Sequence, residues 1–349
     1  MKRLAVVVFN LGGPDKPDAV EPFLFNLFND SAIISLPGIF RIPLAKFISW
    51  RRAPVARNIY KHIGGKSPLL EETQAQAEAL RQKLLGLGDE VRVFIAMRYW
   101  HPFSAAAARE IKAFDPDQII LLPLYPQFST TTTGSSLKEW NRAASDAGLD
   151  KPTRAVCCYP CEEGFIQGLA ELIGPAIAKT EAKKSVDKPV RVLFSAHGLP
   201  EKIIARGDPY QWQIEQTAEA VVAAMGWPDL DWTVCYQSRV GRLKWIGPSL
   251  DDELKRAARD GVSVVVVPVA FVSEHSETLV ELDIEYRAMA KELGVPAYVR
   301  VAALSVQEDF IGGLARTVET GMAAGEAIGC QAGVRQCPSG FAGCPLDRV

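Results

Sequence analysis

The sequence predicts an α/β fold with two parallel sheets flanked by helices, and three observations lead to this prediction. Short runs rich in β-branched and aliphatic residues alternate with stretches of helical periodicity. Several runs, such as AVVVF, QIILLPL and VSVVVVPVAF, are apolar almost throughout, which is typical of parallel strands buried on both faces. The chain has 349 residues, more than one hydrophobic core usually supports, so we expect two domains.

The expected strands form two sets of four. Those of the first half lie near 3–9, 91–96, 118–123 and 153–157. Those of the second half lie near 190–195, 231–236, 262–269 and 297–302. Stretches of helical periodicity cover 71–86, 103–113, 161–178, 211–226, 251–259 and 276–293. The polar segment AKTEAKKSVDKP, 178–189, is the predicted linker between the halves.

The composition is that of an ordinary soluble globular protein, with 48% hydrophobic and 23% charged residues. A net charge of −2 gives no indication of a nucleic-acid partner. The run MKRLAVVVFNLGG is short and leads into a Gly-Gly-Pro turn, which favours a first strand over a signal peptide. Since no apolar run is long enough to span a bilayer, we expect a cytoplasmic protein whose seven cysteines are ligands or buried thiols rather than disulfides.

Polar, aromatic and ionisable residues gather where the predicted strands end. They lie in FNLGGP (9–14), MRYWHP (97–102), YPQFSTTTTGSS (125–136), SAHGLP (195–200), YQSRVG (236–241) and AFVSEHSET (270–278). Ligands of open parallel sheets bind outside these carboxyl ends, so a cleft between the two domains is the expected site. Neither G-x-G-x-x-G nor a Walker A pattern is present, so nucleotide binding is not favoured.

Two histidines follow predicted strands. His197 comes directly after VRVLFSA, and His275 lies beyond VSVVVVPVAF. A lone histidine there would as readily be structural, bonded to a backbone carbonyl. Two histidines in the same kind of position favour a functional role for both. Neutral imidazole both binds metals and accepts protons.

The carboxylates of Glu277, Glu281 and Glu285 recur every four residues and form one ridge if the segment is helical. One interpretation is a solvated outer face, because the apolar stripe lies largely opposite, at Leu279, Leu282, Tyr286, Met289 and Leu293. The other is a ridge that faces cations. Glu277 sits beside a strand end, no Lys or Arg follows Glu277 or Glu281 at the fourth position, and carboxylate oxygens bind Mg, Mn or ferrous iron readily.

Residues 31–52 carry many large apolar side chains and end in Arg51 and Arg52. Pro37 and Pro43 are expected to break any helix there. The segment is either an excursion packed into the core or an apolar lip that binds a flat hydrophobic ligand or touches a membrane.

The C-terminal cysteines Cys330, Cys337 and Cys344 lie among glycines and prolines. Three thiols do not complete a four-ligand metal site, so a fourth ligand is expected from elsewhere in the chain. The segment VCCYPC supplies the candidates Cys157, Cys158 and Cys161. The spacing leaves both zinc and an iron–sulfur cluster open.

In this order, the motifs GGKSP, MRYWHP, YPQFSTTTTGSS, LFSAHGLP, RGDPY, YQSRVG–WIGP and EHSETLVELDIEY resemble those of the ferrochelatase family. The resemblance implies two Rossmann-like domains, each with a four-stranded parallel sheet, and a porphyrin cleft. It implies the division 1–160, 161–310 and a C-terminal helix and tail over 311–349. It also implies insertion of Fe(II) into protoporphyrin IX, the terminal step of haem biosynthesis.

The resemblance also implies roles for individual residues. His197 and Glu277 match the pair that handles the metal and accepts pyrrole protons, while His275, Glu281 and Glu285 match a metal or proton path. Positions that bind the porphyrin match Arg52, Tyr60, Ser67, Arg98, Tyr99 and Trp245. A 2Fe–2S cluster of structural role would be held by Cys158, Cys330, Cys337 and Cys344, with Cys157 and Cys161 as alternatives for the first.

Alternatives remain open within and beyond this family. Coproporphyrin III is a second candidate substrate. A non-catalytic haem or metal carrier, or an iron–sulfur sensor on the same fold, is a different class of function, and a turnover assay separates these from an enzyme. The expected partners are porphyrin and ferrous iron, with peripheral contact of the lip, 31–50, to the inner face of the cytoplasmic membrane.

Overall fold

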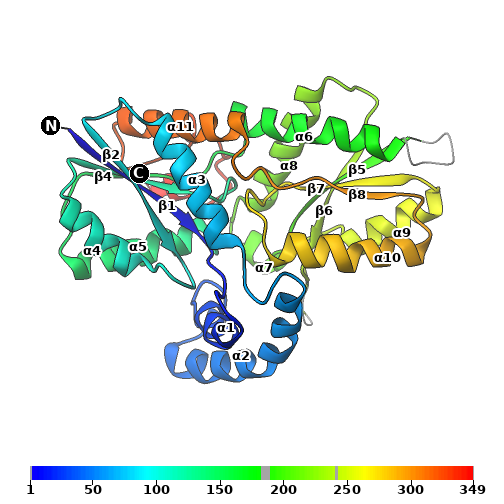
Figure 1. Ribbon diagram of the computed structural model, residues 1–349, viewed down its shortest axis with the longest axis horizontal. Coiled ribbons are helices and arrows are strands. Elements are labelled where there is room, and N and C mark those ends of the chain that lie inside the picture. The colour runs from blue at the N-terminus through cyan, green and yellow to red at the C-terminus, as the bar shows by residue number, and fades with distance from the viewer. Residues whose placement is uncertain (1, 182–188, 240–242, 349) are drawn as a thin grey trace. The chain divides into compact units, whose positions relative to one another are not determined.

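The computed structural model describes residues 2–181, 189–239 and 243–348 (Figure 1). The chain divides into two compact units. Unit 1 consists mainly of Met1–Cys158 and Leu314–Gln336, and unit 2 of Tyr159–Gly313 and Cys337–Asp347. The chain therefore returns to unit 1 after completing most of unit 2.

Unit 1 contains a parallel sheet in the order β2-β1-β3-β4-β9. Its strands are β1 Arg3–Asn10, β2 Glu90–Met97, β3 Gln118–Pro123, β4 Thr153–Val156 and β9 Ile328–Gly329. The first four agree with the predicted strands. The expectation of four strands in this sheet is wrong, because β9 adds a fifth beside β4. A two-residue strand has no periodicity of its own, so its sequence gives no signal.

The helices of unit 1 cover this sheet and extend from it. They are η1 Pro17–Ala19, α1 Val20–Phe28, α2 Gly38–Lys61, α3 Leu69–Lys83, α4 Ser104–Phe114 and α5 Thr133–Ala147, with α11 Glu308–Ala323 running into the unit. Figure 1 shows α4 and α5 side by side. They bury Ile111, Phe114 and Trp140 against Phe9 and Leu121 of the sheet. This core fixes the strand ends that carry the polar motifs.

Helix α2 runs through Pro43 and Pro54 without interruption. The expectation that Pro37 and Pro43 break the helix is wrong for Pro43, whereas Pro37 does precede the first helical residue. A proline leaves the carbonyl four residues earlier unpaired. Here these carbonyls belong to Ile39 and Trp50, which are 77% and 62% exposed, so water can satisfy them.

Unit 2 contains a four-stranded parallel sheet in the order β6-β5-β7-β8, as predicted. Its strands are β5 Val190–His197, β6 Asp231–Gln237, β7 Ser263–Pro268 and β8 Tyr298–Arg300. Its helices are α6 Glu163–Glu181, α7 Glu201–Ile204, α8 Tyr210–Met225, α9 Leu250–Asp260, π-helix η2 Glu277–Tyr286 and α10 Arg287–Leu293, and η3 Pro345–Arg348 ends the chain. All residues of β7 are buried, which explains its continuous apolar run.

The segment 178–189 is not a linker between the two units. Its first residues, 178–181, are the last turn of α6, and residues 182–188 lie outside the described part of the chain. Both α6 and the following strand β5 belong to unit 2. Because the apolar face of α6 packs on this unit, its polar C-terminal turn marks a helix end and not a domain boundary.

The segment expected to be one α-helix over 276–293 consists of two helix types. Residues Glu277–Tyr286 form a π-helix, and Arg287–Leu293 continue as α10. π-Helical geometry hydrogen-bonds each residue to the fifth along the chain, is rare, and frequently occurs at functional sites. The ten-residue π-helix carries all three glutamates of the predicted ridge.

Candidate active site

His197 ends β5 in unit 2, at the carboxyl edge of the sheet. Its Nδ1 lies 2.7 Å from the carbonyl oxygen of Gly198. Because a carbonyl only accepts, Nδ1 carries the proton, and in the neutral ring Nε2 presents its lone pair. Tyr210 fixes the main chain at this point, since its hydroxyl donates to the carbonyl oxygen of His197 over 3.1 Å.

Glu277 lies between two imidazoles of unit 2. Nε2 of His197 is 3.7 Å from Glu277 Oε1, and Nε2 of His275 is 3.7 Å from Glu277 Oε2. Both distances exceed those of a hydrogen bond but are within ion-pair range. The two histidines that follow predicted strands are thus brought to one carboxylate.

The surroundings of Glu277 keep it ionised. Burial by itself favours the neutral acid, but the attraction of an imidazolium at His197 and the contact with His275 outweigh it, so a protonated His197 lowers the pKa of Glu277 to about 2. Nδ1 of His275 is buried and has no hydrogen-bond partner among the described residues. The centre therefore combines an ionised carboxylate with two imidazoles that retain free ring nitrogens.

The three glutamates of the ridge have different surroundings. Glu281 accepts hydrogen bonds from the main-chain nitrogen of Ser238 (2.9 Å) and from Gln237 Nε2 (3.2 Å), and also from the hydroxyl of Ser238. Burial and the neighbouring Glu277 raise the pKa of Glu281. Glu285, at the far end, is exposed. The ridge therefore passes from an ion-paired carboxylate through a hydrogen-bonded one to a solvated one.

Trp245 lies beside the turn after His197. Its main chain forms an isolated antiparallel bridge with Pro200. A Cβ on Gly198 would lie 3.4 Å from the Trp245 ring and 3.1 Å from the carbonyl oxygen of Gln237, so glycine permits this close packing. Nε1 of Trp245 is buried without a hydrogen-bond partner among the described residues.

Unit 1 contains a separate polar cluster around Asp30, which precedes the apolar segment 31–52. Asp30 Oδ2 accepts hydrogen bonds from Arg98 (2.9 Å), Tyr99 (2.8 Å) and Ser135. Asp30 Oδ1 accepts from the main-chain nitrogen of Ala32 (2.9 Å). Burial raises the pKa of Asp30, but these hydrogen bonds and the Arg98 charge outweigh it, so the pKa lies below its usual value.

The other predicted porphyrin-binding residues of unit 1 differ in exposure. Tyr60 and Tyr99 are buried in one apolar cluster. Ser67 is also buried, and its main-chain nitrogen donates to the carbonyl oxygen of Pro14 over 2.8 Å. Arg52 is exposed, with its guanidinium carbon 5.8 Å from the centre of the Phe28 ring.

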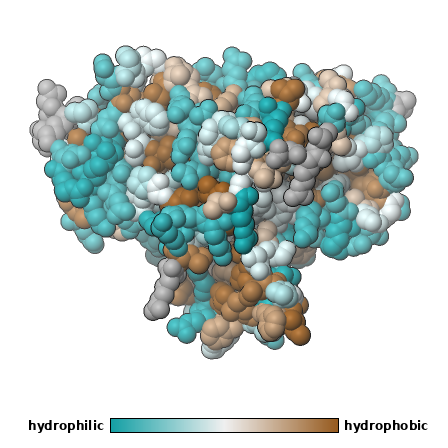
Figure 2. All heavy atoms as spheres, turned by 180° about the vertical axis from the view of Figure 1, so that it is seen from behind, coloured by the Kyte–Doolittle hydropathy of each residue, from teal (hydrophilic) through white to brown (hydrophobic). Residues whose placement is uncertain are grey.

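Most of the large apolar side chains in the segment 31–52 are exposed and not packed into the core. Figure 2 shows brown side chains gathered at the lower end of the view, where Figure 1 places α1 and α2. Large exposed apolar residues in this segment are Ile33, Leu36, Ile39, Phe40, Ile42, Leu44, Phe47 and Trp50. In the described part of the chain, none of the helices combines the length and apolarity needed to cross a bilayer.

The predicted cluster cysteines are divided between the units. Cys158 and Cys330 lie in unit 1, where burial raises the pKa of Cys330 and the neighbouring Cys158 raises it further. Cys337 and Cys344 lie in unit 2, where Gln213 Nε2 donates to Cys337 Sγ over 3.1 Å. Among the described residues, no group of three or more His, Cys, Asp or Glu side chains is placed to hold a metal ion.

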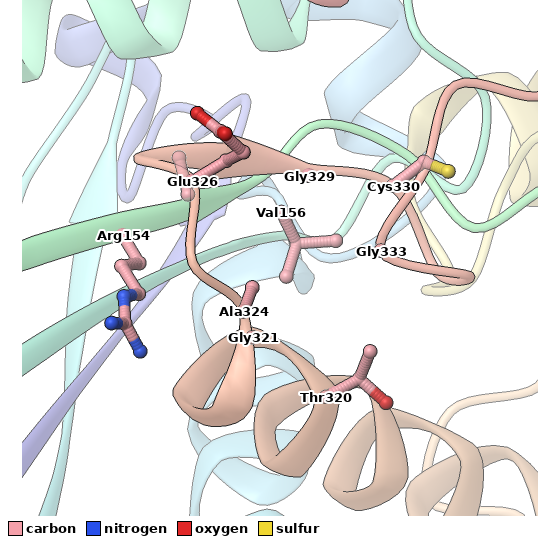
Figure 3. Close-up of a pocket in the computed structure, with 10 residues that line it drawn as sticks. Arg154, Val156, Thr320, Gly321, Ala324, Glu326, Gly329, Cys330 and Gly333 are labelled. Carbon is pink, nitrogen blue, oxygen red and sulfur yellow. The ribbon is translucent and has the colours of Figure 1, made fainter.

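A small cavity lies beside the first tail cysteine (Figure 3). It is lined by residues of β4, the end of α11 and the tail, including Val156, Thr320 and Cys330. Its volume of about 10 Å³ is room for one water molecule. This cavity is far too small for a macrocycle.

Several polar residues of these clusters were not predicted from the sequence. Asp30, Ser135, Gln237 and Ser238 all make hydrogen bonds to predicted site residues. Three of them lie in the strand-end motifs YPQFSTTTTGSS and YQSRVG. The motifs therefore mark the correct loops, but strand and helix periodicity does not tell which polar side chain in a loop turns inward.

The sequence and fold have known relatives. The model of the ferrochelatase family matches residues 3–322. A ferrochelatase of Caulobacter vibrioides is 52% identical over 346 residues, covering 99% of this chain and 97% of the relative. A ferrochelatase of Pelagibacter ubique is 49% identical over 348 residues, covering 99% and 98%.

Solved structures agree in fold. SirB from Bacillus subtilis with Fe3+ aligns with a TM-score of 0.53 at 11% identity, over 93% of this chain and 96% of that one. The sirohydrochlorin chelatase SirB in complex with cobalt, from Bacillus subtilis subspecies spizizenii, aligns with a TM-score of 0.52 at 10% identity, over 90% and 92%. At such identities the likeness concerns the fold alone. The family match and the relatives near 50% identity decide the assignment: the chain belongs to the ferrochelatase family of enzymes.

Proposed function

We propose that this chain inserts Fe(II) into protoporphyrin IX to form protohaem, with His197 and Glu277 as the pair that accepts protons and handles the metal. The observation that supports this most is the position of Glu277 between His197 and His275, each 3.7 Å away, at the carboxyl edge of the unit 2 sheet. Membership of the ferrochelatase family supports the reaction class.

In the proposed reaction, Fe(II) forms bonds to the porphyrin nitrogens while two pyrrole N–H bonds break, so haem and two protons are the products. His197 Nε2 carries the lone pair and takes a pyrrole proton as general base. The ionised Glu277 stabilises the resulting imidazolium and helps to strip water from the iron. His275 and then Glu281 and Glu285 lead from this centre to solvent as the path for protons or metal.

The porphyrin is assigned to apolar walls with a few polar contacts, as is usual for small-molecule sites. Trp245 supplies an aromatic wall near His197, and exposed Arg52 supplies a cation for a propionate. Tyr60, Ser67, Arg98 and Tyr99 are assigned to the same substrate. Arg98 and Tyr99 donate hydrogen bonds to Asp30, which directly precedes the apolar lip. They therefore act on the substrate mainly by holding the start of this lip in place.

Two finer assignments accompany this function. The 2Fe–2S cluster on Cys158, Cys330, Cys337 and Cys344 rests on the family resemblance, and no proposed step uses it. The exposed apolar side chains of α2, with Arg51 and Arg52 on the same helix, are assigned to peripheral contact with an anionic membrane surface. Both assignments lie outside the chemistry of metal insertion.

The test is anaerobic insertion of Fe(II) into protoporphyrin IX, followed by absorbance, for wild type, His197→Ala and Glu277→Gln. We expect haem formation by the wild type and a loss of about 10²-fold or more in each variant, the usual contribution of a general base. Glu292→Gln, an exposed position on α10, is the control. Activity with coproporphyrin III alone would change the substrate, and activity with neither porphyrin would refute the proposed function.

A further inference from the structure

Gln237 connects the two sides of the His197–Glu277 pair through its main chain and its side chain. It is the last residue of β6 and lies opposite His197 in the register with β5. Its carbonyl oxygen accepts a hydrogen bond from the main-chain nitrogen of Gly198 over 2.9 Å. The main chain of Gln237 therefore holds the turn that directly follows His197.

The side chain of Gln237 is fully buried and reaches the π-helix. Nε2 donates to the main-chain oxygen of Glu277 and to Glu281 Oε2, both at 3.2 Å. Oε1 accepts from the hydroxyl of Ser195 over 2.8 Å, two residues before His197. The main-chain oxygen of Glu277 can only accept, so the amide nitrogen has to face it, and this fixes the amide orientation.

We propose that Gln237 is a positioning residue that sets the separation between His197 Nε2 and Glu277 Oε1. The inference rests on the proposed roles of His197 and Glu277. Gln237 touches neither reacting group, but it bonds to the main chain beside each of them. A displacement of reacting groups by about 1 Å can cost about 10²-fold in rate, so a residue that fixes this separation acts on turnover.

An amide is the side chain that this position requires. A carboxylate of the same shape would place oxygen against the Glu277 carbonyl and the Glu281 carboxylate, and three acceptors would repel. An apolar side chain of similar volume would fill the space but leave the hydroxyl of Ser195 and the carboxylate of Glu281 without this buried partner. The two substitutions therefore disturb the same connection in different ways.

Gln237→Glu and Gln237→Met are the test variants, and Gln216→Glu is the matched control. Gln216 lies on α8 and its amide donates to Glu219 over 2.9 Å in an exposed pair. kcat and KM for Fe(II) and protoporphyrin IX are measured on folded protein. Amide hydrogen exchange is measured over peptides that cover residues 277–286.

For Gln237→Glu we expect kcat to fall by at least about tenfold while both KM values stay within about threefold of wild type, since only the reacting geometry changes. Exchange over 277–286 should accelerate in both variants, and Gln216→Glu should match wild type. Unchanged kcat, or a loss that appears in KM alone, overturns the proposal.

The exchange measurement needs no turnover, so it separates this inference from the proposed function. If wild type inserts no iron but exchange over 277–286 accelerates in the variants, the proposed function fails and the connection through Gln237 stands. If exchange over this segment does not change, the positioning role is overturned whatever the activity. Should Gln237→Glu not fold, Gln237→Met carries both measurements.

Discussion

The hydroxyl of Tyr99 donates a hydrogen bond to Asp30 over 2.8 Å, although 69 residues separate them in the sequence. Arg98 and Ser135 bond to the same carboxylate oxygen. Asp30 directly precedes the apolar segment 31–52, whereas Arg98 and Tyr99 follow the strand β2. This buried carboxylate therefore ties the start of the exposed apolar segment to the edge of the unit 1 sheet.

Replacing Asp30 should destabilise the fold. For Asp30→Asn we expect the free energy of unfolding to fall by about 2–4 kcal/mol, because Arg98 is left with a neutral partner in a buried site. Tyr99→Phe should cost less, about 1.5 kcal/mol, since one hydrogen bond to a charged group is lost. Denaturant unfolding measures both. Asp15→Asn, at an exposed position, is the control, and an equal effect of Asp15→Asn and Asp30→Asn would contradict the assignment.

The Asp30 cluster should also make stability depend on pH in the acid range. The pKa of Asp30 is lowered from the ordinary value of 3.8, so the folded state holds this proton less tightly than the unfolded chain. The contribution is fully present above 3.8 and is lost as the pH falls further through the folded-state pKa. The difference in unfolding free energy between wild type and Asp30→Asn should therefore be constant near neutral pH and shrink below about pH 4. A difference that grows on acidification would show that the sign is wrong.

Much of the fold follows from local sequence, because the central strands are buried on both faces and leave continuous apolar runs. The run VSVVVVPVAF predicts β7 for this reason. The strand β9 has two residues and depends on pairing with β4, so no local signal exists. The prediction that Pro43 breaks the helix is wrong because the effect of this proline depends on whether water reaches the carbonyl of Ile39. The sequence does not reveal that Ile39 is exposed.

The sequence predicts which segments form the candidate site better than it predicts which side chains contact one another there. Strand ends select the segments of His197 and His275, and helical spacing selects Glu277, and the structure brings these three together. Their chemical roles stay predictions. The role of Asp30 is not predictable from the sequence, because its hydrogen-bond partners Arg98 and Ser135 lie 68 and 105 residues away along the chain. Such pairings are set by the topology of the sheet and not by any local pattern.

The exposed apolar face of α2 should bind membranes. We expect wild type to sediment with vesicles that contain anionic lipid, and the double variant Phe40→Asp/Trp50→Asp to stay largely in solution. The physical reason is that both side chains are mostly exposed, and burying apolar surface in the bilayer interface drives such binding. Leu85→Asp, which removes an exposed apolar side chain elsewhere in unit 1, is the matched control. Equal sedimentation of the double variant and wild type would contradict the assignment.

Substitution of the cysteines tests two separate points: whether the protein holds an iron–sulfur cluster, and which cysteine is its fourth ligand. Protein purified without oxygen should contain iron and acid-labile sulfide and absorb in the visible range, and Cys330→Ser should lose all three signals, because thiolates are the usual ligands of such clusters. Cys158→Ser should lose them as well, whereas Cys161→Ser should retain them. The reason is that Cys158 lies close enough to Cys330 to raise the pKa of its thiol. Retention in Cys158→Ser with loss in Cys161→Ser would move the fourth ligand to Cys161, and zinc in place of iron and sulfide in the wild type would refute the cluster itself.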